Sequence, residues 1–156
     1  MAKANFTGVS ESYIFENAGD KRDQLEQCIL NQLEKKSYPL KATIQTLKGG
    51  SGLLGAVFAT KKQCVVIDVD EEANIAISNT KVGSYLYVEI YLLVLEKMFS
   101  VAAFDAAIGN VFEQQRRRAY YAAARSATED AFGELNLKLV NTGYQSTKNS
   151  ISDSKE

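Results

Sequence analysis

The stretch SYLYVEIYLLVLE, residues 84–96, carries the clearest structural pattern in the chain. Its even positions from 86 to 94 are uniformly aliphatic. Its odd positions begin with side chains that end in a polar group, Tyr85, Tyr87, Glu89 and Tyr91. A period of two residues is typical of a β-strand with one face in the core. We therefore predict a strand over 84–96 whose aliphatic side packs on helices and whose tyrosine-bearing side faces away from them.

Alternating or apolar runs on the N-terminal side of this strand extend it into a sheet. Strands are predicted over 11–16, 41–47, 52–60, 63–70 and 74–80. The last strands are joined by short polar connections, whereas parallel neighbours need a crossover of about a dozen residues or more. We therefore expect mostly antiparallel pairing. On 63–70 the alternation predicts Val65, Ile67 and Val69 facing inward, with the other side formed by Cys64, Val66, Asp68 and Asp70.

Two helices complete the predicted fold. Helical spacing over 21–36 begins after Asp20, which we expect to cap the helix, and stops before Pro39. An alanine-rich helix is predicted from about Phe104 to Asn136. The fold class is therefore α+β, an antiparallel meander of about five strands with one face packed by an N-terminal and a long C-terminal helix. Helix-grip, TBP-like and secretion-chaperone-like folds all share this plan.

Composition favours one soluble domain in the cytoplasm. The chain has 156 residues, a formal charge of -1 and 46% hydrophobic residues, so no net field recruits nucleic acid or a membrane surface. We expect residues 1–140 to form the domain and 141–156 to be a flexible polar tail. The N-terminus lacks the pattern of a signal peptide, and charged residues interrupt the apolar stretch 84–104, so we expect no membrane span.

The residue types restrict the chemistry. The chain has no histidine, the residue that most often serves as a general base or a zinc ligand. Catalytic Ser-His-Asp triads and Cys-His dyads are therefore excluded. Cys28 and Cys64 lie in apolar surroundings, and we expect both to be buried and reduced. The acidic residues Asp68, Asp70, Glu71 and Glu72 are interpreted as a solubilising strand end. We expect no metal and no cofactor, and we lean against an enzyme.

Glycines at 50, 52 and 55 match the G-x-G-x-x-G spacing of dinucleotide sites. That site needs a helix after the glycines that leads into a parallel strand. Here only EEAN separates the strand ending at Asp70 from the next, so no second βα unit follows. We therefore interpret 49–55 as a bend.

Three surfaces could carry function. Tyr85, Tyr87, Glu89 and Tyr91 form a candidate recognition surface, although tyrosines also line half-exposed sheets for structural reasons. Arg116, Arg117 and Arg118 form a candidate anion or nucleic-acid contact, although a solvated helix surface with a Glu113–Arg117 pair is the plainer interpretation. The small residues of AYYAAARSA (119–127) allow close approach of another helix, such as that of a second copy.

The run from Ile75 to Leu92, followed by Phe104, Asp105 and a long helix, resembles a group of small prokaryotic α+β proteins without an assigned activity. Their G-x-x-L-Y-V-x-x-Y-L pattern corresponds here to Gly83, Leu86, Tyr87, Val88, Tyr91 and Leu92. Ile90 departs from it, because a tryptophan is expected there. The resemblance would cover residues 40–136 and implies the meander without a function.

The leading functional hypothesis is a non-enzymatic cytoplasmic interaction or assembly domain that associates with itself or another protein. The alternative is a helix-grip pocket for an apolar small molecule. Contact of an anion or nucleic acid with the arginine cluster is the least favoured of the three.

Overall fold

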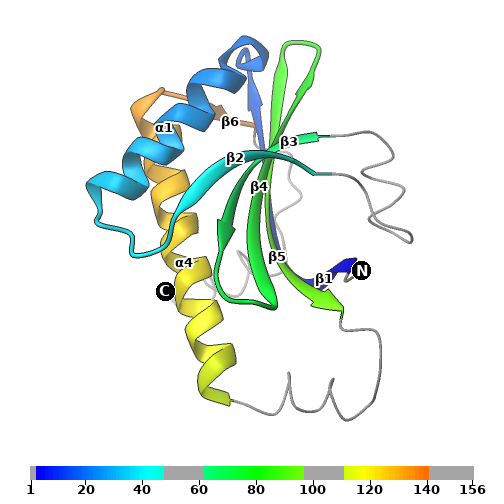
Figure 1. Ribbon diagram of the computed structural model, residues 1–156. Coiled ribbons are helices and arrows are strands. Elements are labelled where there is room, and N and C mark those ends of the chain that lie inside the picture. Colours follow the sequence, from blue (N-terminus) through cyan, green and yellow to red (C-terminus); the bar gives the residue numbers. More distant parts are fainter. Residues whose placement is uncertain (1–2, 48–61, 97–110, 141–156) are drawn as a thin grey trace, which may run out of the picture.

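The computed structural model describes residues 3–47, 62–96 and 111–140, and it has the predicted α+β class. In this part of the chain, one antiparallel sheet of six strands carries a shorter and a longer helix (Figure 1). The elements in chain order are β1 (Lys3–Glu16), the short 3-10 helix η1 (Gly19–Lys21), α1 (Arg22–Lys35), β2 (Ala42–Leu47), β3 (Lys62–Asp68), β4 (Ala73–Val82), β5 (Tyr85–Glu96), α4 (Val111–Glu134) and β6 (Lys138–Leu139). The predicted strand 52–60, the bend 49–55 and the tail 141–156 lie outside the described residues.

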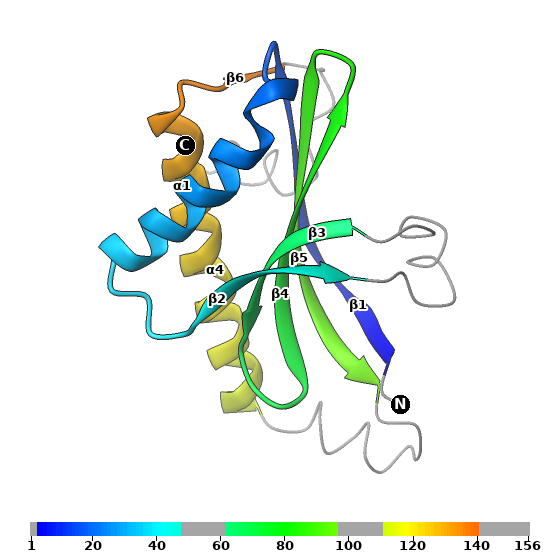
Figure 2. The ribbon, with the colours of Figure 1, turned by 45° about the horizontal axis from the view of Figure 1, so that its top comes forward.

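Strand β5 has the position that its alternation predicts. The strand order is β2-β3-β4-β5-β1-β6, so β5 lies between β4 and β1, and every neighbouring pair is antiparallel. Leu86, Val88 and Ile90 are fully buried in the main core. Figure 2 shows β2 and β3 crossing the direction of β4 and β5 steeply, so the sheet is strongly twisted.

Strand β1 is longer than predicted, because it begins at Lys3 and not at residue 11. Phe6 pairs with Leu93 and Ser10 pairs with Tyr91, so three residues of β1 lie opposite one residue of β5. This β-bulge interrupts the period of two and hides the first half of the strand from a search for alternation. The two-residue strand β6, which pairs with the end of β1, was also not predicted.

Helix α1 ends as predicted but begins differently. Asp20 does not cap it, because this residue lies in η1 and α1 starts at Arg22 without a side-chain cap. At the other end Ser37 adopts a positive φ of 55°, and the N–H of Tyr38 donates to the carbonyl of Leu33 at 2.9 Å. This Schellman-type arrangement ends the helix before Pro39.

Both helices pack on the same face of the sheet, where their apolar side chains form the main core (Figures 1 and 2). Leu25 and Ile29 of α1 are fully buried there. On α4, Phe132 lies against Phe15 of β1 with ring centroids 4.6 Å apart. Each fully buried side chain of this size contributes about 1.5–3 kcal/mol to stability, so this layer holds α4 firmly.

The opposite face of the sheet carries a smaller buried cluster. Ala76, Tyr91 and Leu93 pack there with Leu47, and Cys64 is fully buried. Cys28 on α1 is also buried, and both cysteines are free thiols, as predicted.

The predicted alternation holds for Val65, Ile67 and Val69, which belong to the main core, but it fails at Asp70. Strand β3 ends at Asp68, and Asp70 lies in the turn to β4, where its side chain contacts α4. The two aspartates therefore do not share a strand face.

Candidate functional site

The tyrosine-bearing side of β5 is held together by one carboxylate. Glu89 accepts hydrogen bonds from Tyr87 at 3.0 Å and from Tyr91 at 2.6 Å. The Ser12 hydroxyl of β1 lies 3.2 Å from the Tyr87 oxygen. Burial and the Glu89 carboxylate raise the pKa of Tyr91, so this phenol stays protonated as a donor.

The four predicted recognition residues do not form one exposed patch. Tyr91 is 6% exposed and belongs to the smaller core cluster, whereas Tyr85 is 42% exposed. Tyr85 pairs with Val82 of β4, which is also exposed, at the hairpin that joins β4 to β5. What reaches solvent here is mainly this hairpin end, while Tyr87 and Glu89 are half-buried beside Tyr91.

Lys62 lies on the same side of the sheet and was not singled out from the sequence. Its ammonium group donates to the Thr80 hydroxyl, and burial lowers the pKa of Lys62. The sequence pattern of β3 could have predicted this position, because residues two apart on a strand share a face and Lys62 is two residues from Cys64. This side of the sheet therefore combines an ammonium group, a carboxylate and hydroxyls.

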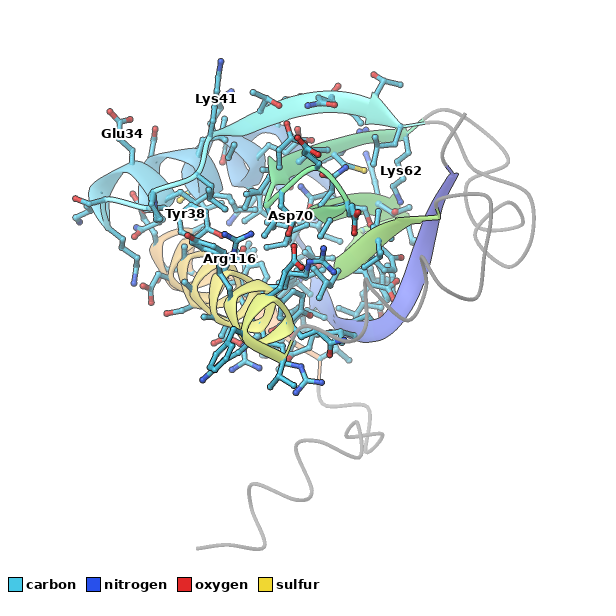
Figure 3. The ribbon with its side chains drawn as sticks, turned by 60° about the horizontal axis from the view of Figure 1, so that its bottom comes forward. Glu34, Tyr38, Lys41, Lys62, Asp70 and Arg116 are labelled. Carbon is cyan, nitrogen blue, oxygen red and sulfur yellow. The ribbon has the colours of Figure 1, made fainter. Side chains whose placement is uncertain are left out.

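The three consecutive arginines have three different environments. Arg117 is 4% exposed, and its Nε lies 2.9 Å from Oδ2 of Asp70. Arg116 lies at the side of α4 near the same aspartate, with its Nη2 3.6 Å from Oδ2 (Figure 3). Arg118 is exposed. An anion at this cluster would compete with the protein's own carboxylates for Arg117.

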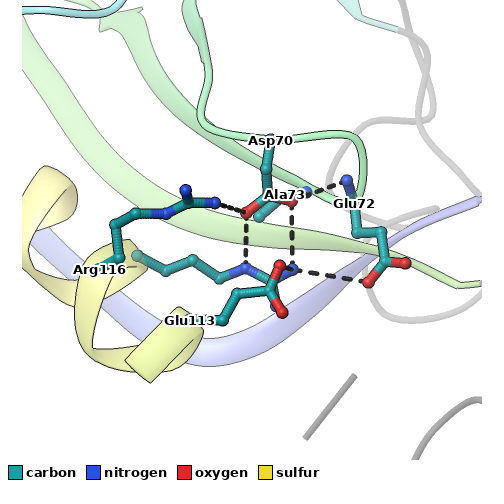
Figure 4. Close-up of polar contacts among 6 residues, drawn as sticks. Asp70, Glu72, Ala73, Glu113 and Arg116 are labelled. Atoms are coloured by element: carbon teal, nitrogen blue, oxygen red, sulfur yellow. Dashed lines mark hydrogen bonds and ion pairs between the residues drawn. The ribbon is translucent and has the colours of Figure 1, made fainter. Parts of the chain in front are cut away.

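Asp70 connects the β3–β4 turn to α4 (Figure 4). Its Oδ1 accepts the backbone N–H groups of Glu72 at 2.8 Å and Ala73 at 2.9 Å, and Nη2 of Arg117 lies 3.1 Å away. Nη2 also lies 3.5 Å from a carboxylate oxygen of Glu113, which is the predicted helical pair. The sequence indicates this contact only indirectly. The turn contains several acidic residues, and an arginine cluster follows later in the chain.

The side of α4 that points away from the sheet has few charges at its centre. We call this side the outward face of α4. It consists of exposed residues at helical spacing, Gln115, Ala119, Ala122, Ala123, Ser126 and Gly133. The buried side of the same helix includes Tyr121, Ala124 and Phe132. An exposed helix surface is normally rich in charged residues, so this face differs from an ordinary solvated one.

Charged residues lie along both edges of the outward face. At 100° per residue, Arg116 falls on one edge and Asp130 lies 40° inside it, between Ala119 and Ala123, whereas Arg118 and Glu129 fall on the other edge. The contacts agree with this, because Asp130 pairs with Lys36, which follows α1, whereas Glu129 accepts a hydrogen bond from Tyr13 of β1 at 2.8 Å. Toward each edge the arginine is N-terminal and the acid is C-terminal.

The sequence matches no model of a known protein family and no curated protein. Within residues 3–47, 62–96 and 111–140, no helix is long and apolar enough to cross a membrane. In the same ranges, no three cysteine, aspartate or glutamate side chains are grouped closely enough to hold a metal ion.

Proposed function

We propose that this chain is a non-enzymatic assembly domain of the cytoplasm that associates with a second copy of itself. The proposal rests on one observation, the exposed outward face of α4 with Ala119, Ala122, Ala123 and Ser126 at its centre. Small side chains let two helices approach to about 8–10 Å between their axes, which gives close contact over several turns. The opposite side of α4 is anchored in the main core, so a partner would meet a rigid surface.

The ligand-pocket alternative has less support from the packing. Between α4 and the sheet, Tyr121 and Ala124 are buried, and the Tyr121 hydroxyl lies 3.4 Å from the carbonyl of Ile90. Between α1 and the sheet, Leu25 and Ile29 are fully buried. These side chains occupy the space in which a helix-grip protein would hold its ligand.

Sedimentation velocity of the full chain, from micromolar to submillimolar concentration, tests the proposal. We expect a reversible monomer–dimer equilibrium. Ala122→Glu should shift it to monomer, because the variant places a carboxylate in the middle of the outward face. The matched control is Asn31→Glu, which adds the same charge to an exposed position of α1 and should leave the equilibrium unchanged. A wild-type chain that stays monomeric over the whole range would refute the proposal.

A further inference from the structure

We propose that the two copies pair through α4 in antiparallel orientation, with Ala123 of each copy next to the two-fold axis. This inference rests on the proposed function and specifies its partner surface and register. It follows from the order of charges along the outward face of α4, which makes this face complementary to itself.

A two-fold axis perpendicular to two antiparallel helices brings the same edge of each helix together. With Ala123 at the axis, position 116 of one copy lies level with position 130 of the other, because both are seven residues away. Arg116 then faces Asp130 of the second copy. On the other edge, position 118 of one copy lies level with position 128 of the second copy. Arg118 is therefore one residue away from being level with Glu129 of the second copy. Both edges therefore pair an arginine with an acid.

A parallel, in-register pair would have the opposite effect. Its two-fold axis would run along the helices and bring opposite edges together, so that Arg116 would approach Arg118 of the second copy and Asp130 would approach Glu129. Like charges on neighbouring helices repel, so the charge order favours the antiparallel arrangement.

The charged side chains on these edges retain accessible surface. The side chains of Arg116, Glu129 and Asp130 are 52%, 48% and 49% exposed, despite their contacts within the chain. A carboxylate accepts several hydrogen bonds, so Glu129 and Asp130 can each bind an arginine of a second copy as well.

Gly133 adds an independent observation. A Cβ built on this glycine meets open space, so nothing in the described part of the chain explains a glycine at the last turn of the helix. In the proposed register Gly133 lies within one residue of Phe112 of the second copy, a residue that is 81% exposed. A glycine at this position provides room for the ring of that residue.

The test is a charge reversal in two chains that are studied separately and then mixed. In a dimer of Arg118→Glu, positions 118 and 129 of opposite copies are both acidic at each of the two symmetry-related contacts. In a dimer of Glu129→Arg, both positions are arginines at each contact. Each variant should dimerise about tenfold to thirtyfold more weakly than wild type in sedimentation velocity. An equimolar mixture should dimerise as wild type does, because both edge pairs are then oppositely charged.

The pair Arg116→Glu and Asp130→Arg repeats the test on the other edge, and it replaces the first pair if Glu129→Arg unfolds when its contact with Tyr13 is lost. Thermal unfolding of each variant checks the fold. A wild-type dimer whose mixed variants stay dissociated would refute the register and leave the proposed function standing. A monomeric wild-type chain would refute both.

Discussion

Replacing Arg117 by methionine tests whether its contact with Asp70 holds α4 to the β3–β4 turn. The Arg117 side chain is 5% exposed and that of Asp70 is 13% exposed, so the substitution removes the nearer cation of a mostly buried carboxylate and leaves Arg116, whose Nη2 lies 3.6 Å from Oδ2. Removing one partner of a buried pair costs about 3–5 kcal/mol. Because Asp70 keeps two backbone N–H donors, we expect the lower end, about 3 kcal/mol.

The reciprocal variant Asp70→Asn should cost less. The asparagine oxygen can still accept the two backbone N–H groups of the turn, and Arg117 keeps Glu72 and Glu113, each with an oxygen 3.5 Å from Nη2. We expect a loss of about 1–2 kcal/mol, since only the charge of one hydrogen-bonded partner is removed. The assay is urea unfolding followed by circular dichroism at neutral pH, with Lys41→Met, an exposed position outside α4, as the control. A loss of stability below about 1 kcal/mol for Arg117→Met would refute the reasoning. A loss for Asp70→Asn that exceeds the loss for Arg117→Met would also refute it.

The same contact should make stability depend on acidic pH. Burial raises the pKa of Asp70, but hydrogen bonds from Arg117 and the backbone outweigh burial and lower it overall. A carboxyl whose pKa is lower in the native state stabilises the fold fully above its unfolded pKa of about 4 and loses this contribution as pH falls through the native value. The difference between wild type and Arg117→Met should therefore shrink below that pH. A difference that stays constant down to pH 2 would contradict this assignment.

Three further predictions follow from single groups. Burial raises the pKa of Cys28 to about 12 and that of Cys64 to about 11, so both thiols should react with a thiol reagent at pH 8 only as fast as the chain unfolds; rapid labelling of the native chain would contradict this. Tyr91→Phe removes the 2.6 Å hydrogen bond to Glu89 and should cost about 1–2 kcal/mol in urea unfolding, whereas no loss would mean that solvent replaces the phenol. Gly133→Ala should stabilise the monomer against heat by up to about 1 kcal/mol, because alanine favours helix and the added Cβ meets open space, and yet weaken dimerisation; stronger dimerisation would contradict the proposed register.

Sequence periodicity was sufficient to predict the centre of the fold. Strand β5 alternates cleanly because Leu86 and Val88 face two helices while Tyr87 and Glu89 face away. It was insufficient at β1, where a bulge between Phe6 and Ser10 breaks the alternation. Local patterns describe neighbours along the chain, whereas a bulge is defined by the strand opposite.

The candidate site shows the same limit. The alternation of β5 correctly placed the tyrosines on one side but could not tell that Tyr91 is buried and Tyr85 is exposed. The arginine cluster was visible in the sequence, but the partner of Arg117 was not, because Asp70 is distant in sequence and belongs to a turn. The small residues of α4 are visible in the sequence, yet their exposure depends on which side of the helix faces the sheet.

Disulfide trapping at the proposed two-fold axis tests the central claim most directly. Cysteines at position 123 of two copies should lie within disulfide reach, whereas cysteines at position 126 should lie about 9 Å apart along the helix axes, from a rise of 1.5 Å per residue. Under mild oxidation Ala123→Cys should form a covalent dimer, and the matched variant Ser126→Cys should remain monomeric on a non-reducing gel. No dimer at position 123, or equal trapping at both positions, would contradict antiparallel association through α4.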